Sequence, residues 1–185
     1  MIESPTSYQN NLTDADYQMI GTLAVSWATT EHVIGNCLKT MMRLTDDEAQ
    51  ITLFPLGLER RISHMQELAK MPEAKWHREV LDDLAELALV MRALNFVRNN
   101  VLHAICINDA QGETSFHLRS KNRTLPKEQV LSVQELTNYA ARVALDLRHE
   151  LGFKKLGVYG FGAEPLPDRP PIPDFLKSFF PAKPR

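Results

Sequence analysis

Residues 14–43 read DADYQMIGTLAVSWATTEHVIGNCLKTMMR, and the spacing of apolar side chains in this stretch decides the fold class. Steps of three and four residues connect them along one face, which predicts a single long helix. Thr13 is a suitable N-cap, and acidic Asp14 and Asp16 favour a helix start in the first turn. The predicted face comprises Tyr17, Ile20, Ala24, Trp27, Glu31, Ile34, Leu38 and Met41.

Three further helical patterns follow. A capping box at Thr45-Asp-Asp-Glu48 starts the second, which is interrupted near Pro55 and Gly57 and resumes from Leu58 until Pro72. The third runs from Pro72 to about residue 104, with the face Val80, Leu84, Leu87, Met91, Leu94, Arg98 and Val101 or Leu102. The fourth opens at the box Ser132-Val-Gln-Glu135 and stops at Gly152, with the face Leu136, Ala140, Val143, Leu147 and Leu151.

A short β-hairpin is predicted between the third and fourth helices. Residues alternate in polarity over Ala104–Asn108 and Thr114–Arg119, and Asp109-Ala-Gln-Gly112 separates the two runs. Four helices with short connections are typical of an up-and-down bundle. We therefore expect an all-α fold, an up-and-down four-helix bundle with a small β-hairpin inserted between helices 3 and 4.

The last 33 residues differ from the rest of the chain. Seven of the 11 prolines lie between Pro165 and Pro184, and six of the 14 aromatic residues lie between Phe153 and Phe180. Such a segment cannot form a long helix, and its Phe content is high for a solvated linker. The prediction is a helical domain over residues 1–152 and an extended arm over 153–185, which docks on its own bundle or on a neighbouring chain, or is partly disordered.

Composition and charge exclude several classes of protein. The net charge of −2 excludes a generally basic nucleic-acid binder, yet residues 92–127 hold six Lys and Arg against two Asp and Glu. Cys37 and Cys106 cannot form a disulfide framework. No signal peptide is evident, and no apolar run reaches 18 residues. We expect a cytoplasmic protein that does not enter a membrane.

Two charged residues occupy faces that should be apolar: Glu31 in the first helix and Arg98 in the third. A charge on a packed face is costly unless it is paired or hydrated, so these two residues either meet each other or meet water in a cleft. Arg98 also lies among polar neighbours of the same helix. These are Arg92, Asn95, Asn99 and His103.

The polar residues around Arg98 have a chemistry in common. Arginine holds phosphate oxygens in a bidentate manner, histidine exchanges protons near neutral pH, and asparagine can orient either group. Together they could bind a phosphodiester and transfer a proton without a metal ion. The alternative role for His103 is structural, because a histidine at a helix end is often satisfied by a carbonyl group or by a carboxylate such as that of Glu31.

The segment 98–103, RNNVLH, resembles the R-x(4–6)-H motif of HEPN domains, in which a polar residue often follows the arginine. Trp27-x-x-x-Glu31 in the first helix is also similar to that family, and the resemblance covers about residues 14–151. It implies a four-helix bundle that dimerises, with the motifs of two subunits facing one cleft. Many HEPN proteins are metal-independent endoribonucleases, often toxins; others are inactive partners or nucleotide-binding modules.

A second arginine–histidine pair, Arg142-x(6)-His149, fits the bare pattern. It lacks the polar residue after the arginine, and His149 lies near the end of the fourth helix, where a capping role accounts for it.

The expected function is metal-independent RNA cleavage, with no cofactor and no bound metal. Arg98 would stabilise the phosphorane, His103 would act as general acid or base, and Asn99 and Glu31 would orient them. The nucleic-acid-binding residues would be Arg92, Asn95, Arg119, Lys121 and Arg123, the last three from a basic segment that could also be an ordinary solvated loop. The expected partners are a second copy, RNA and a cognate antitoxin. The alternative is a non-catalytic interaction or nucleotide-binding module of the same fold.

Overall fold

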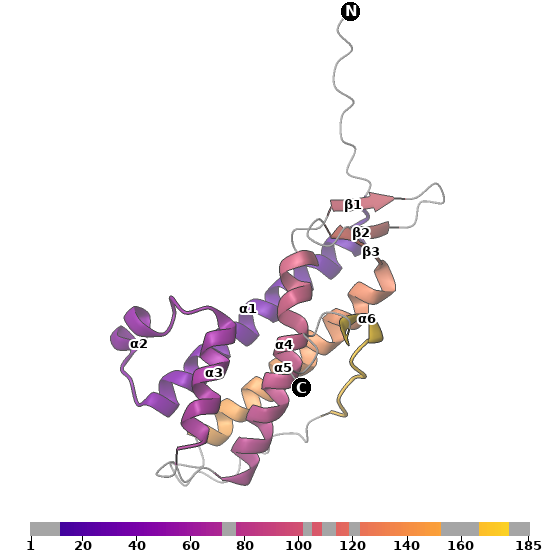
Figure 1. Ribbon diagram of the computed structural model, residues 1–185. Helices are drawn as coiled ribbons and strands as arrows, with labels where there is room; N and C mark the ends of the chain where they lie inside the picture. Colours follow the sequence, from indigo (N-terminus) through magenta and orange to yellow (C-terminus); the bar gives the residue numbers. More distant parts are fainter. Residues whose placement is uncertain are drawn as a thin grey trace, which may run out of the picture.

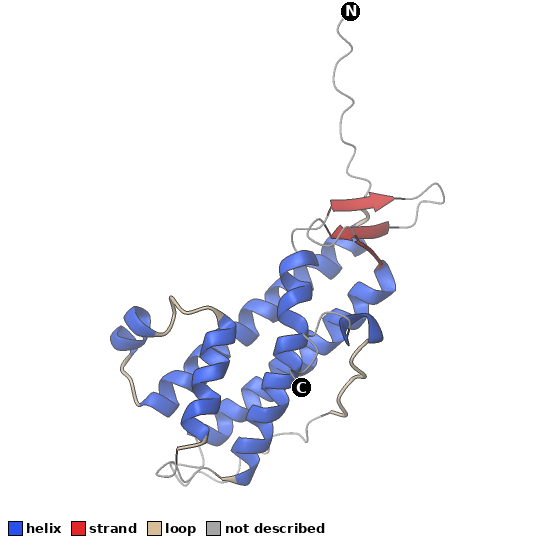
Figure 2. Ribbon diagram, in the orientation of Figure 1, coloured by secondary structure: helices blue, strands red, loops and turns tan. Residues whose placement is uncertain are grey.

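The computed structural model describes residues 12–71, 77–101, 105–108, 114–118, 123–152 and 167–177. These residues are mostly helical and carry one small antiparallel sheet (Figures 1 and 2). The helices are α1 (Asp14–Met42), α2 (Asp46–Thr52), α3 (Leu58–Ala69), α4 (Arg78–Val101), α5 (Lys127–Gly152) and α6 (Asp174–Lys177). The strands are β1 (Ile105–Asn108), β2 (Thr114–Leu118) and β3 (Arg123–Pro126).

The long helices α1 and α5 pack along each other and run in the same direction. Contacts between them follow one order along both helices: Asp16 with Lys127, Ser26 with Asn138, and Cys37 with Ala144. A simple up-and-down order would make the first and fourth long helices antiparallel. The difference arises because α2 and its flanking loops lead the chain back along α1. As a result, α3 begins beside the middle of α1 and not at its C-terminal end (Figure 1).

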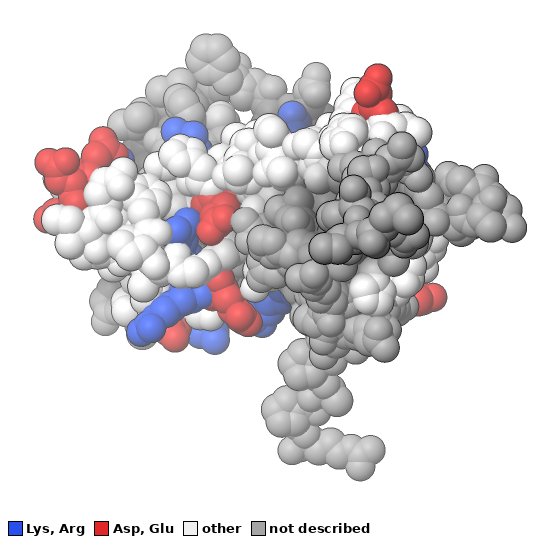
Figure 3. All heavy atoms as spheres, turned by 90° about the horizontal axis from the view of Figure 1, so that it is seen from above, with Lys and Arg blue, Asp and Glu red and all other residues white. Residues whose placement is uncertain are grey.

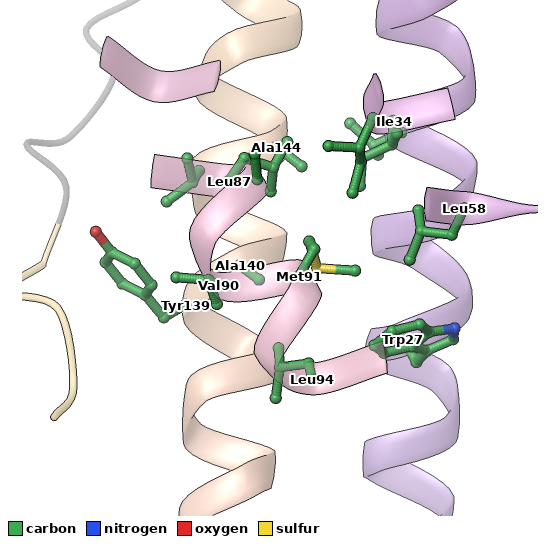
Figure 4. Close-up of a cluster of buried hydrophobic side chains, with 14 of the residues drawn as sticks. Trp27, Ile34, Leu58, Leu87, Val90, Met91, Leu94, Tyr139, Ala140 and Ala144 are labelled. Atoms are coloured by element: carbon green, nitrogen blue, oxygen red, sulfur yellow. The ribbon is translucent and has the colours of Figure 1, made fainter. Parts of the chain in front are cut away.

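The core lies between α1, α4 and α5, and α3 covers one side of it (Figure 4). The apolar faces predicted for the third and fourth helices are confirmed from Val80 to Leu94 and from Leu136 to Leu151, since every described member is buried. The face predicted for α1 is wrong in its first turns. Tyr17 is 51% exposed, and the buried positions there are Asp16, Met19 and Leu23.

Capping chemistry explains where the first two helices begin. Thr13 and Thr45 each accept a hydrogen bond from the backbone N–H three residues on, and the acidic residue at that position accepts from the cap's own N–H. The box predicted at Ser132 is wrong, because α5 begins five residues earlier at Lys127. The Ser132 hydroxyl instead donates to the Glu128 carbonyl, 3.0 Å away within the same helix.

The predicted hairpin is confirmed over β1 and β2, which pair antiparallel from Ile105 opposite His117 to Asn108 opposite Thr114. The predicted end residues Ala104 and Arg119, and the connecting loop, lie outside the described residues. The third strand, β3, was not predicted. It pairs with β2 at the sheet edge, where Pro126 is tolerated because an edge strand does not need every N–H.

The described part of the C-terminal arm packs on the helical body. Leu176 in α6 is 1% exposed and belongs to the core, and Ile172 and Phe175 pack against it. Arg169 forms an ion pair with Glu86 of α4 at 2.9 Å. Residues 167–177 of the arm therefore dock on the chain's own helices. Among the helices described, none combines the length and the apolar character needed to cross a membrane.

Candidate functional site

A groove of about 940 Å³ opens between α1, one face of α3 and Asn95 in the C-terminal half of α4. Two apolar side chains contribute to its lining: Trp27 of α1, which is 2% exposed, and Leu58 at the start of α3 (Figure 4). Its volume lies within the range of ligand-binding pockets. The remaining lining residues are mostly polar or charged: Glu31, Gly57, Glu59, Arg60, Ser63, His64, Glu67 and Asn95.

Buried Arg61 fixes the α1 side of this groove to α3. Its guanidinium donates to the carbonyls of Leu53, Phe54 and Glu31 at 3.2, 2.7 and 3.3 Å. The Glu31 carboxylate lies 4.0 Å from the same guanidinium and keeps 32% of its side chain exposed. Glu31 is thus a half-buried acid at the edge of the groove, and Arg61 is its described ionic partner.

The α4 side of the groove is provided by Asn95. One turn earlier on the same helix, Arg92 is exposed and donates to the Gln66 side chain of α3 at 2.9 Å. This hydrogen bond holds α3 beside the C-terminal half of α4. Arg98 follows Asn95 by three residues, which is about 4.5 Å along a helix axis.

The structure brings together some of the predicted site residues. Glu31 and Asn95 line the same groove, whereas Arg92 is engaged with Gln66 beside it. Arg98 and Asn99 belong to α4, and Arg123 begins β3, but the structure does not describe the side chains of these three residues. His103, Arg119 and Lys121 lie outside the described residues.

Five charged or polar groove residues were not found from the sequence, all of them in α3: Glu59, Arg60, Ser63, His64 and Glu67. The sequence assigned no role to His64 because its spacing to other histidines and cysteines fits no metal site. His64 lines the groove because α3 packs against α1 and α4, and no local sequence pattern predicts that packing. The signal available was the helical period from Leu58, which places Arg60, Ser63 and His64 away from the buried face.

Charge in the groove is of mixed sign. Glu31, Glu59 and Glu67 oppose Arg60, so the described lining has more acid than base. Acidic side chains also gather over the end of the molecule where α2 lies, and basic and acidic side chains lie side by side on the described surface next to that end (Figure 3). A polyanion therefore meets no broad basic stripe on the described surface of this face.

The Cys37 thiol lies in the core, away from the groove. Burial raises the pKa of the Cys37 thiol to about 12, so the thiol stays protonated and hydrogen-bonds weakly to the Ala144 carbonyl at 3.8 Å. Within the described ranges, no three His, Cys, Asp or Glu side chains converge in a manner suited to a metal ion.

Comparison with known proteins yields no match to a family model, to a curated protein or to a solved structure. The function is therefore argued from the groove and from the residues next to it.

Proposed function

We propose that this protein is a HEPN-like, metal-independent endoribonuclease whose catalytic residues are Arg98 and His103, oriented by Asn99 and Glu31. In this proposal α1, α3, α4 and α5 form the four-helix bundle of that family. The observation that carries the proposal is the common groove of Trp27, Glu31 and Asn95. This groove brings the Trp-x-x-x-Glu pattern of the first helix next to Asn95, which is one of the polar residues around Arg98 and precedes Arg98 by about one helical turn.

The chemistry follows from these residue types. The ribose 2′-oxygen attacks the adjacent phosphorus, so that the bond from O2′ to phosphorus forms while the bond from phosphorus to O5′ breaks. His103 transfers a proton to or from these oxygens, and the Arg98 guanidinium neutralises the charge of the phosphorane. The products carry a 2′,3′-cyclic phosphate and a free 5′-hydroxyl.

The proposal extends to partners. A two-fold axis beside α4 would bring two copies of the motif to one cleft, because a symmetric interface places the same residues on both sides. Arg119, Lys121 and Arg123 would steer the RNA backbone towards it. A ribonuclease of this kind acts in the cytoplasm as a toxin and is held in check by a cognate antitoxin protein.

The test is cleavage of a mixed RNA in the presence of EDTA by the wild type and by His103→Ala. We expect the substitution to reduce the rate by about 10²–10⁴-fold, the usual contribution of a positioned acid or base. His77→Ala is the matched control, since His77 is exposed before α4 and does not line the groove. Equal rates for the wild type and His103→Ala would remove His103 from the mechanism.

A second candidate function is a non-catalytic binding module. The carboxylates of Glu31, Glu59 and Glu67 favour it, because they repel phosphate and accept hydrogen bonds from Lys or Arg side chains of a protein partner. Expression in cells separates the two functions. Toxicity that Arg98→Ala relieves supports the ribonuclease, and harmless overexpression supports the module.

A further inference from the structure

The described part of the C-terminal arm contacts the helical body through its side chains. Leu176 is buried on α4, Ile172 and Phe175 are half-buried beside it, and Arg169 forms its ion pair with Glu86. The backbone hydrogen bond from the Leu176 N–H to the Pro173 carbonyl, at 2.9 Å, stays within the arm. The arm is therefore held as a bound peptide is held, by a few anchoring side chains.

The sequence of the arm also suits a peptide ligand. Four of the seven residues 167–173 are proline, and these seven residues form neither helix nor strand. Proline fixes the backbone angle φ, so such a segment loses little conformational freedom when it docks on a protein surface. Three of its anchors follow at steps of three and four residues: Arg169, Ile172 and Leu176.

The docking face on the helices is assembled without the arm. The Tyr139 hydroxyl of α5 donates to the Glu86 carboxylate of α4 at 3.2 Å, and Tyr139 is only 8% exposed. Figure 4 shows its ring turned to the side of the helices where the arm lies. Arg169 then donates to both oxygens of the same carboxylate at 2.9 and 3.1 Å. This acceptor is in place whichever copy of the chain supplies the arginine.

The length of the chain does not restrict the arm to its own body. From Tyr139, α5 continues for 13 residues to Gly152, which is about 20 Å along the helix axis. Arg169 follows Gly152 by 17 residues, and a chain of that length reaches about 55–60 Å at most. The connection is more than twice as long as the return to Tyr139 requires, so it also reaches a neighbouring molecule.

We propose that the face of α4 and α5 around Glu86 and Tyr139 binds the arm of a second copy of this chain, so that two copies exchange residues 167–177 reciprocally. Every contact that the arm makes with its own helices is then repeated between the copies. Exchange of an identical element is a low-cost route to a dimer for that reason. Protein concentration decides the balance, because the arm of the same chain competes at a high effective concentration.

Two cysteine variants test the exchange in the full chain. One carries Arg169→Cys in the arm, and the other carries Glu86→Cys in the docking face. The ion pair that they lose is partly exposed to water, so the buried Leu176 contact still holds the arm. The two variants are mixed and treated with a bis-maleimide cross-linker that replaces the length of the two side chains. We expect mass spectrometry to find residues 86 and 169 linked between the two variants, in a yield that rises with protein concentration.

The controls separate exchange from other association. A chain with both cysteines is the positive control, because docking in either arrangement links them. Adding Leu176→Ala to the Arg169→Cys chain should lower the yield between chains about tenfold or more, since it removes the buried contact. Adding Asp168→Ala, at an exposed position of the same arm, should change the yield less than about twofold. Dimers that form through other surfaces do not link residues 86 and 169.

Two outcomes would overturn the proposal. If the chain with both cysteines links within itself and the mixed variants never link at residues 86 and 169, the arm is a fixed part of its own body. If the mixed variants link equally well with and without Leu176→Ala, the link does not report the docked arm.

Discussion

Gly35 lies where α1 must approach the loop before α3 closely. A Cβ added there would lie 2.7 Å from the Phe54 ring, and the same ring lies under the Arg61 guanidinium at 5.7 Å. The absence of a side chain at this position therefore allows the Phe54 and Arg61 cluster to close the α1 edge of the groove. Gly21 in the same helix is different, since an added Cβ would meet nothing within 4 Å.

We predict opposite effects for alanine at these two glycines. Gly35→Ala should lower the free energy of unfolding by about 1–3 kcal/mol, because it overpacks the contact with Phe54. Gly21→Ala, the control, should raise it by about 0.5–1 kcal/mol through helix propensity. Urea denaturation measures both, and a Gly35→Ala protein as stable as Gly21→Ala would contradict the packing described for Phe54.

Residue chemistry also shows what the sequence could predict of the site. Glu31 was identified because a charge on an apolar helical face needs an explanation, and Asn95 because it is one of the polar residues around Arg98. Arg61 was not, although it is the described partner of Glu31. Its spacing in α3 looks ordinary, and its importance depends on three carbonyl groups that tertiary structure places around it.

At the scale of elements, helix starts with a threonine cap were predicted correctly and the start of α5 was not. Thr13 and Thr45 follow non-helical residues, so their hydroxyls can accept from the first turn. Ser132 fits the same local pattern but lies inside a helix that begins directly after β3. The sheet determines that start, because β3 leads directly into Lys127, whose ammonium pairs with Asp16 of α1 at 2.6 Å.

We predict that the start of α2 loosens in acid. Hydrogen bonds from the backbone N–H and the hydroxyl of Thr45, both at 2.8 Å, hold the pKa of Glu48 below its ordinary value. A carboxyl whose pKa is lower in the folded chain stabilises the fold above its ordinary pKa, and this contribution is lost as pH falls through the folded value.

An NMR titration tests the prediction for Glu48. Its carboxyl should titrate below the ordinary glutamate range, and the α2 amide signals should shift with it. In Glu48→Gln these amides should lose that pH dependence. A Glu48 carboxyl that titrates at or above its ordinary pKa would show that the capping box does not persist in solution.

At the scale of the whole molecule, the described part of the C-terminal arm, residues 167–177, holds to the helical body through an apolar contact region and a polar one. Leu176 is the buried side chain of the apolar region, on α4, and Ile172 and Phe175 pack beside it. The polar one joins Arg169 and Tyr139 through the Glu86 carboxylate, to which the tyrosine hydroxyl donates at 3.2 Å. Burial, and then the Glu86 charge, raise the pKa of Tyr139 to about 12, so the hydroxyl remains a donor at neutral pH.

We predict that the apolar contact contributes most of the docking energy. Leu176→Ala should lower the free energy of unfolding by about 2–5 kcal/mol, as for other buried leucines. Arg169→Ala, its control in the same segment, should cost less than about 1 kcal/mol, because the ion pair is partly exposed to water. Equal stability of Leu176→Ala and the wild type in urea would mean that the arm does not dock as described.

The overall class of fold was predictable, whereas the direction of packing was not. Periodicity and caps specify helices along one chain, but they carry no information on whether α1 and α5 run parallel. That arrangement depends on how α2 and its loops return the chain, and on pairs such as Ser26 with Asn138 at 2.7 Å. The groove arises from the same packing, which explains why its α3 lining was missed.

The proposed function is cleavage of RNA through the 2′-hydroxyl, with Arg98 and His103 as the catalytic residues. The most direct measurement compares one defined RNA with the same sequence carrying 2′-O-methyl groups throughout, in EDTA, with analysis of the product ends. We predict that only the unmodified RNA is cut, that its products carry 2′,3′-cyclic phosphate and 5′-hydroxyl ends, and that Arg98→Ala abolishes the cut. Equal cutting of the methylated RNA, 5′-phosphate ends, or intact RNA after incubation with the wild type would contradict the claim.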